Sequence, residues 1–163
     1  SGNRVSVRDV DSAIVSQNAD NLYMNGTSTN STWQLQQGNM HVANDAYLAS
    51  NGTNSLQLNG GALNLQNGAA TTINLASMNV RSNSNVNIDV DVANGSIDRF
   101  AFASPDDLNL DDVVFNINNV NMLNSNKVSS DTYRLNFVDP SLNNTKFLGK
   151  VSANVSVAEK AAT

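Results

Sequence analysis

The stretch SLQLNGGALNLQNG, from Ser55 to Gly68, decides the fold expected for this chain. It holds two short apolar alternations on either side of an Asn-Gly-Gly turn, Leu56/Leu58 and Leu63/Leu65. Alternate residues of a strand point to opposite faces of a sheet, so the leucines of each pair share one face while Gln57 and Asn64 face solvent. The stretch therefore predicts two short strands, joined by a turn, with a common buried face.

The same apolar spacing returns along the chain at a nearly constant period. One series of pairs is Trp33/Leu35, Leu56/Leu58, Met78/Val80 and Phe100/Phe102. A second series is Met40/Val42, Leu63/Leu65, Val86/Ile88 and Leu108/Leu110. A weaker first turn of the same series is expected at Ser12/Ile14 and Asp20/Leu22. A period of about 22–23 residues is typical of a solenoid, in which each repeat buries its apolar face only against its neighbours.

The residues between the apolar pairs select the kind of solenoid. They are mostly Asn, Gly, Ser and Thr, and they show no helical spacing, which disfavours a leucine-rich repeat. Gly60 and Gly61 suit a tight turn between strands because they carry no Cβ. Asn side chains at stacked turns, as in QNG (66–68), NSN (83–85) and ANG (93–95), are candidates for amide ladders.

These patterns together predict an all-β fold. We expect a right-handed parallel β-helix over residues 1–110, truncated at its amino-terminal side, with coils of about 22–23 residues each. Residues 111–163 are predicted to form an irregular or hairpin-like cap, or an autochaperone-like region.

Charge and cysteine content exclude several classes of function. The formal net charge is −5, and the basic residues are scattered rather than clustered, which argues against nucleic-acid binding. The absence of cysteine excludes a thiolate nucleophile, a cysteine-based zinc site and any disulfide. With 40% hydrophobic and only 14% charged residues, the chain is not expected to be disordered.

Three stretches together resemble a known family. STWQLQQGNMHV (31–42), SLQLNGGALNLQNG (55–68) and VNIDVDVANGSIDRFAF (86–102) resemble the carboxy-terminal passenger region of bacterial type V autotransporters, the pertactin-like and AIDA-like adhesins. The match departs from the family pattern by one extra residue between Ser96 and Asp98. The resemblance covers residues 32–102, and the chain carries Asn where the family often has Gly.

The resemblance implies a function and a location. It implies a β-helical stalk segment of a secreted adhesin, which is extracellular and displayed on the bacterial cell surface in association with the outer membrane. Carboxy-terminal coils of such passengers nucleate folding during export through a separate outer-membrane β-barrel. The implied partners are a glycan or protein on a host or neighbouring cell, and further copies of the chain. Nucleic acid is not among the expected partners.

The candidate sites each have a plain structural interpretation. His41 lies between two inward residues and is expected to face solvent rather than to act as a base. Asp89 and Asp91 share one face of a strand and are expected to form a charged outer surface. Trp33 belongs to an inward series, which favours core packing over a sugar-stacking patch with Tyr47. A further acidic group around Pro105 is expected to be a solvated loop: Asp106, Asp107, Asp111 and Asp112.

We therefore predict a protein that is not an enzyme, with no catalytic residues, no cofactor and no metal. Three alternatives stay open. A polysaccharide lyase or hydrolase on the same scaffold would use the paired aspartates with Arg81 or Arg99. A calcium-dependent binding module would use clustered carboxylates, since Ca²⁺ takes several oxygen ligands. A two-partner secreted haemagglutinin would share the shape alone.

Overall fold

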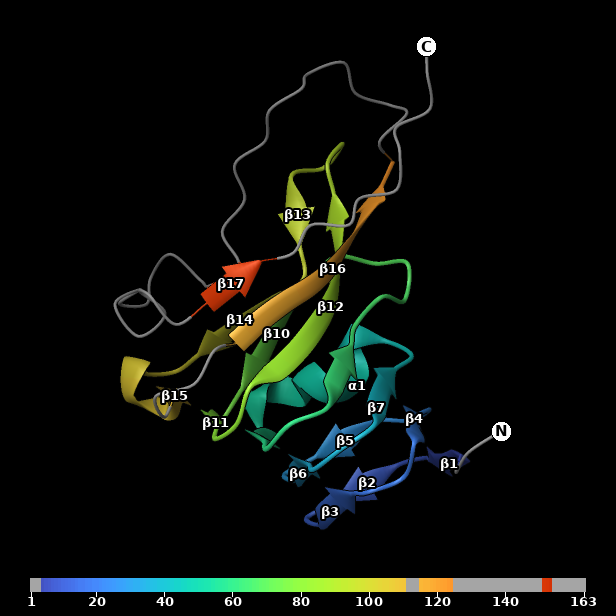
Figure 1. Cartoon of the computed structure of the whole chain (residues 1–163), viewed down its shortest axis with the longest axis vertical. Coiled ribbons are helices and arrows are strands. Elements are labelled where there is room, and N and C mark those ends of the chain that lie inside the picture. Colours follow the sequence, from blue (N-terminus) through green and yellow to red (C-terminus); the bar gives the residue numbers. More distant parts are fainter. Residues whose placement is uncertain (1–3, 111–114, 125–150, 154–163) are drawn as a thin grey trace.

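The computed structural model describes residues 4–110, 115–124 and 151–153 (Figure 1). The described chain is built mainly from short strands, as the sequence predicts for an all-β protein. Every strand pairing within these ranges is parallel except one, the antiparallel pair of β12 and β13.

Four sheets hold the described strands. The largest has the order β1 (Arg4–Val7), β4 (Asn21–Met24), β7 (Asn39–Val42), β9 (Ala62–Asn64), β12 (Ser84–Asp91), β16 (Phe115–Leu123), β17 (Val151–Ala153), with β13 (Ser96–Ile97) beside β12. The second has the order β15 (Leu108–Leu110), β11 (Ser77–Val80), β8 (Ser55–Leu58), β6 (Thr32–Leu35), β3 (Ile14–Gln17). Two smaller sheets pair β2 (Val10–Asp11) with β5 (Ser28–Thr29), and β10 (Thr72–Leu75) with β14 (Arg99–Phe102).

The described strands up to β15 follow one another in five units, and corresponding strands of successive units pair in parallel. Unit 1 holds β1–β3, unit 2 holds β4–β6, unit 3 holds β7 and β8, unit 4 holds β9–β11, and unit 5 holds β12–β15. In unit 3 a helix, α1 (Asp45–Ala49), and a 3₁₀ turn, η1 (Ser50–Gly52), replace the middle strand. Both contact β5 and β10, so they separate the two small sheets.

Helix α1 is not predicted from the sequence, because a single short turn of helix shows no helical spacing. Its amino-terminal cap is Asn44, whose side chain accepts a hydrogen bond from the Ala46 backbone N–H at 3.0 Å. The buried side chain of Asn54 fixes its far end, because it donates to the Leu48 carbonyl at 2.8 Å and to the Ser28 carbonyl of β5 at 2.7 Å. Asn54 therefore ties unit 3 to unit 2.

The replacement Asn54→Ala is expected to lower the free energy of unfolding by about 1–3 kcal/mol, because it leaves buried carbonyl groups without a hydrogen-bond donor. The Asn54 side chain also accepts from the Ser28 hydroxyl at 2.8 Å. Urea denaturation followed by circular dichroism measures the change. Asn74→Ala, at an exposed position of β10, serves as the control and should shift stability by no more than about 0.5 kcal/mol. Equal effects of both variants would contradict the role given to Asn54.

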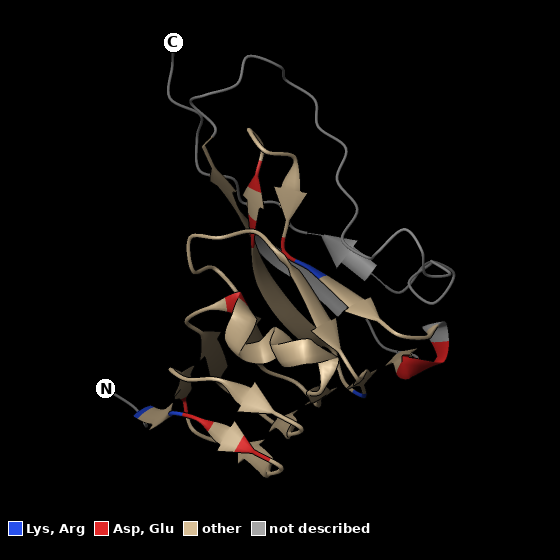
Figure 2. Cartoon of the chain, turned by 180° about the vertical axis from the view of Figure 1, so that it is seen from behind, with Lys and Arg blue, Asp and Glu red and all other residues tan. Residues whose placement is uncertain are grey.

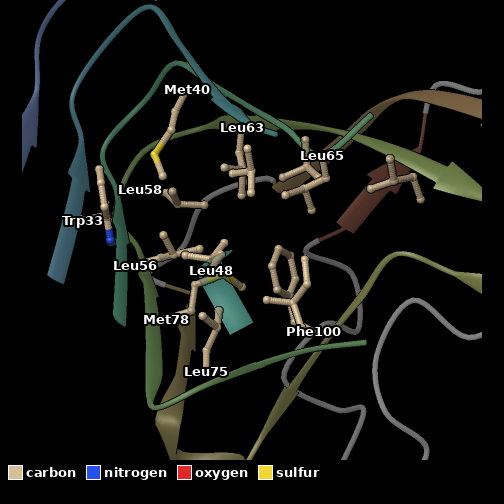
Figure 3. Close-up of a cluster of buried hydrophobic side chains, with 14 of the residues drawn as sticks. Trp33, Met40, Leu48, Leu56, Leu58, Leu63, Leu65, Leu75, Met78 and Phe100 are labelled. Carbon is tan, nitrogen blue, oxygen red and sulfur yellow. The ribbon is translucent and has the colours of Figure 1, made fainter. Parts of the chain in front are cut away.

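The central part of the predicted repeat is confirmed. Leu56 pairs with Met78 and Leu58 with Val80 in the second sheet, while Met40, Leu63 and Val86 pair in turn in the largest sheet. The alternating residues are buried and form one continuous apolar core, part of which Figure 3 shows. Gly60 and Gly61 have φ angles of 125° and 75°, which confirms the expected glycine turn between β8 and β9.

The predicted position of the last apolar pair is wrong in both series. The expected place of Phe100 is above Met78, but Phe100 pairs with Ile73 in the small β10–β14 sheet. Leu108, further along the chain, takes the place above Met78 instead. The predicted position of Leu108 above Val86 is also wrong, because β16 occupies it. Unit 5 is longer than its predecessors because β12 continues past the common register into the β12–β13 hairpin.

The expected first turn is wrong in its register. Val15 pairs with Trp33, and Gln17 with Leu35, at a shorter sequence separation than the predicted period. Ile14 is 73% exposed instead of buried. Leu22 is buried as expected and pairs with Met40, again at the shorter separation. The early units are shorter because their middle strands, β2 and β5, have two residues each.

The predicted cap begins at residue 111, and part of it joins the largest sheet. β16 pairs in parallel with β12 along its length, with a register irregularity after Val86. β17 pairs in parallel with β16. The remaining residues of the predicted region, 111–114, 125–150 and 154–163, lie outside the described residues.

Candidate functional site

The first candidate region is a row of polar side chains on the outer face of the second sheet. The residues between the buried ones in β3, β6 and β8 lie in register, and they bond to one another across the strands. The Ser16 hydroxyl donates to Gln34 Oε1 at 2.7 Å, and Gln34 Nε2 donates to Gln57 Oε1 at 3.2 Å. We call these three residues the glutamine row. Each amide retains donor or acceptor capacity beyond these bonds, which a partner surface can use.

A second row lies on the outer face of the largest sheet. Tyr23 and His41 are in register and stack with ring centroids 4.4 Å apart, and the Arg4 guanidinium lies 4.0 Å from the centre of the Tyr23 ring. Asn64 Nδ2 lies 3.2 Å from His41 Nδ1, and Asn21 Oδ1 lies 2.9 Å from His41 Nε2. The amide donor at Nδ1 and the carbonyl acceptor at Nε2 assign the neutral tautomer protonated on Nε2.

His41 is half-buried on the outer face, so its expected outward orientation is confirmed. Burial lowers the pKa of His41, because it disfavours the charged imidazolium, and positively charged Arg4 lowers it further. The two ring nitrogens face the amides of Asn21 and Asn64, so within the described ranges the ring is oriented by amides rather than by a carboxylate. The side chain therefore contributes packing and hydrogen bonds to the row.

The second candidate region is a buried cluster of three aspartates, Asp45, Asp89 and Asp98. The expectation that Asp89 lies on a charged outer face is wrong, because its side chain is fully buried. Asp89 Oδ2 accepts from the backbone N–H groups of Asn67 and Gly68 at 2.8 and 2.9 Å. Asp89 lies in the part of β12 beyond β9, where residues 88–90 are buried in succession and strict alternation ends.

Asp45 and Asp98 tie the middle of the molecule together. Asp45 accepts from Asn67 Nδ2 at 2.6 Å and from the Thr71 hydroxyl at 2.7 Å. Asp98 accepts from the backbone N–H of Asp89 at 2.7 Å and of Thr71 at 3.2 Å. Burial raises the pKa of Asp98 to about 9, with further contributions from a hydrogen bond to the Asp45 carboxyl and from the Asp45 charge. Asp98 is therefore protonated at neutral pH, and its carboxyl group is hydrogen-bonded to Asp45.

These aspartates hold loops and strands together rather than forming an open ion site. Among the residues that the structure describes, no group of three or more His, Cys, Asp or Glu side chains is arranged to hold a metal ion. Asp107 in the turn η2 (Pro105–Asp107) accepts from the Ser104 backbone N–H at 3.0 Å, and Asp106 is exposed. The other two acidic residues of that predicted group, Asp111 and Asp112, lie outside the described residues.

The third candidate region is a small pocket beside the β12–β13 hairpin. Its volume is about 210 Å³, and its lining is Ala70, Thr71, Thr72, Gly95, Ser96, Ile97 and Arg99. Arg99 is half-buried at the start of β14, and its Nε donates to the Thr72 hydroxyl at 3.0 Å. Arg81, the basic residue considered with it, is exposed after β11, and the register pairs Arg99 with Thr72 instead.

The aromatic candidates separate in the structure. Trp33 is 1% exposed and its indole N–H donates to the Ser28 hydroxyl at 2.8 Å, which confirms core packing (Figure 3). Tyr47 of α1 packs against the core and is partly buried. With Trp33 inside the core, this pair does not form a sugar-stacking patch.

The sequence does not indicate the buried aspartate cluster or the pocket. Both depend on the loop 66–71, which brings Asn67 and Thr71 against α1 and β14. The amide ladders expected at the QNG and ANG turns are wrong, because Asn67 bonds to Asp45 and Asn94 bonds to Asp91. Amide rows form on the strands instead, where successive units lie in register.

Comparisons with known proteins gave no match to a family model, to a curated protein or to a solved structure. In the described ranges, none of the helices has the length and apolar character needed to cross a membrane.

Proposed function

We propose that this chain is a stalk segment of a secreted bacterial surface adhesin, and that its five units are coils of a right-handed parallel β-helix. The support is the parallel pairing of corresponding strands, which joins each unit to the next through backbone hydrogen bonds. A continuous apolar core runs through the same units. Units that bury their apolar face only against one another suit an elongated, rigid display element.

The observation that carries the adhesive part is the glutamine row. The Ser16 hydroxyl on β3 and the side-chain amides on β6 and β8 lie in register and present a series of donors and acceptors on the outer face of the sheet. Such a surface suits hydrogen bonding to glycan hydroxyls, to a protein surface or to another copy of the chain. Basic residues are few and separate along the described strands, so attraction of phosphate plays little part (Figure 2).

The buried aspartates favour this proposal over a polysaccharide-cleaving enzyme. Both oxygens of Asp89 accept hydrogen bonds from within the protein, Oδ2 from the loop at 67–68 and Oδ1 from Asn121 at 2.8 Å. A carboxylate so occupied is not available to a sugar proton. Asp91, on the same strand, is not buried and accepts from Asn94 instead.

Adhesion is tested with beads coated with the purified chain and passed over surfaces that carry a glycan panel or the chain itself. Wild-type beads should be retained several-fold more than albumin-coated beads on at least one surface. The double variant Gln34→Ala/Gln57→Ala should lose most of that retention, because it removes the amides of the glutamine row. The matched control Asn18→Ala/Asn74→Ala changes two exposed amides elsewhere and should keep it.

Retention equal to albumin on every surface would contradict the adhesive function. Release of new reducing ends from soluble acidic polysaccharides would replace it with the enzymatic alternative. Thermal unfolding of each variant, followed by circular dichroism, shows whether a loss of retention reflects the surface or the fold.

A further inference from the structure

Arg99 has an unusual environment for a half-buried charge. Its Nε donates to Thr72, which leaves four of the five guanidinium N–H donors for other partners. Within the described ranges, no carboxylate pairs with it. Removing a charge from water costs free energy unless the charge is paired, and Arg99 is partly removed from water. The guanidinium is therefore positioned, by Thr72, for an anion from outside the fold.

The pocket around Arg99 sets the size of that anion. A volume of about 210 Å³ is below the roughly 300–1,000 Å³ of pockets for drug-sized ligands, so it suits one ring-sized group. Ser96 and Thr72 supply hydroxyls, and the backbone at Gly95 is accessible. Ala70 and Ile97 add a small apolar surface. Hydroxyl groups beside a short apolar wall match a sugar ring, which has polar edges and a C–H face.

The charges near the pocket permit an anion there. Asp98 precedes Arg99 in the chain, but its side chain is buried and bonds to the backbone of Asp89 and Thr71. The Asp45 carboxylate is likewise buried and accepts from the Thr71 hydroxyl. Asp91 pairs in register with Ser96, and its carboxylate accepts from the backbone and side chain of Asn94. None of these three carboxyl groups lines the pocket, so Arg99 is the charged residue among the described residues of its wall.

We propose that this pocket binds the carboxylate of an acidic sugar, a uronate, with the Arg99 guanidinium as the anion contact and with Ser96 and the Gly95 backbone toward the ring hydroxyls. A planar guanidinium matches a carboxylate through two parallel hydrogen bonds, which a single ammonium group cannot make. One positive charge on the wall matches one carboxylate. This site is separate from the glutamine row, so the proposal of uronate binding does not depend on the proposed stalk function.

The test is calorimetric titration of the purified chain with trigalacturonate and, separately, with the fully methyl-esterified trisaccharide. The acid form should bind in the millimolar range or tighter, and the ester at least about tenfold more weakly, because it lacks the charge that pairs with Arg99. In a third arm, inorganic phosphate should not displace trigalacturonate at equal concentration. Equal binding of acid and ester, or no saturable binding of the acid, would overturn the proposal, and displacement by phosphate would overturn the uronate assignment.

Matched variants assign the binding to the pocket. Arg99→Gln should weaken trigalacturonate binding at least about tenfold, while Arg81→Gln removes the same charge outside the pocket and should change it less than about twofold. Equal losses in both would show non-specific attraction and overturn the site. Thr72→Val keeps Arg99 but removes the hydroxyl that orients it, and should weaken binding several-fold. Should Arg99→Gln fail to fold, the Arg99 Nε–H signal in the NMR spectrum of the wild type must shift on titration, and an unmoved signal would contradict the proposal.

Discussion

Replacing Leu58 by alanine is expected to lower the free energy of unfolding by about 2–5 kcal/mol. Leu58 is fully buried in β8 and lies in register between Leu35 of β6 and Val80 of β11. The removed methyl groups leave a cavity at the centre of the stacked core, and close-packed neighbours fill it only in part. The loss is measured by urea denaturation monitored with circular dichroism.

The matched control for Leu58→Ala is Ile14→Ala, at an aliphatic residue of β3 in the same sheet that is 73% exposed. Its effect should stay within about 0.5 kcal/mol, since little apolar surface returns to water. A comparable loss at both positions would mean that the stacked core does not carry the stability. A negligible loss at Leu58 would contradict its burial between successive units.

The second large effect is a fall in stability with rising pH that depends on Asp98. Its pKa in the folded protein is raised to about 9, chiefly by burial and also by the hydrogen bond to Asp45 and the Asp45 charge. The unfolded chain releases this proton at about pH 4, so the folded state binds more protons throughout the window between about pH 4 and pH 9. Stability contributed by this group therefore falls as pH rises through that window, by at most about 1.4 kcal/mol per pH unit.

The variant Asp98→Asn should flatten this dependence. Asparagine cannot ionise, yet its amide can still donate to Asp45 and its oxygen can accept one of the two backbone N–H groups that bond to Asp98. We expect the variant to be less stable than wild type by about 1 kcal/mol at pH 5, for one lost hydrogen bond, and more stable at pH 9. The readout is the melting temperature measured at intervals from pH 5 to pH 9.

The control for this experiment is Asp91→Asn, the same replacement at an aspartate outside the buried cluster. A hydrogen bond from Asn94 lowers the pKa of Asp91, so its stabilising effect is lost under acid and not in the alkaline range. The Asp91 variant should therefore keep the wild-type slope between pH 5 and pH 9. If both variants flatten the curve equally, the slope comes from overall charge and not from the Asp45–Asp98 pair.

The sequence predicts the middle of the fold well, for a physical reason. Where the chain between pairs has a nearly constant length, as from Trp33 through Leu56 to Met78, a constant period places inward residues over one another. Alternation in these strands comes from one buried face and one outer face, which is the simplest pattern to recognise.

The errors occur where a unit is shorter or longer than the predicted period. The β12–β13 hairpin lengthens unit 5, so a fixed period assigns Phe100 to a place that Leu108 fills. The hairpin strands carry the same residue types as the strands of the repeat. The hairpin therefore cannot be recognised as an insertion from the spacing of apolar pairs. The prediction for Asp89 is wrong for a related reason. β12 continues into a region where residues 88–90 are all buried, so both faces of the strand are shielded from solvent there.

The candidate sites are the least predictable part. The pairing of Asp45 with Asp98 joins residues far apart in the sequence through the loop 66–71, and local spacing carries no signal for it. The orientation of Arg99 by Thr72 depends on the register of β10 with β14, which a constant period misses. The predictions for His41 and Trp33 are confirmed because each lies inside a regular strand.

The unequal length of the units also bears on how the chain avoids misassembly. The sequence separation between successive inward residues of the second sheet is shortest from Val15 to Trp33, longer from Trp33 through Leu56 to Met78, and longest from Met78 to Leu108. Identical repeats can exchange places or slip past one another, since any repeat fits any other. Here unit 3 contains a helix and unit 5 contains a hairpin, so these units differ from their neighbours. If the strands paired with the wrong unit, the helix and the hairpin would lose their native contacts. The irregularities that break the constant period thus favour a single position for each unit in the folded chain.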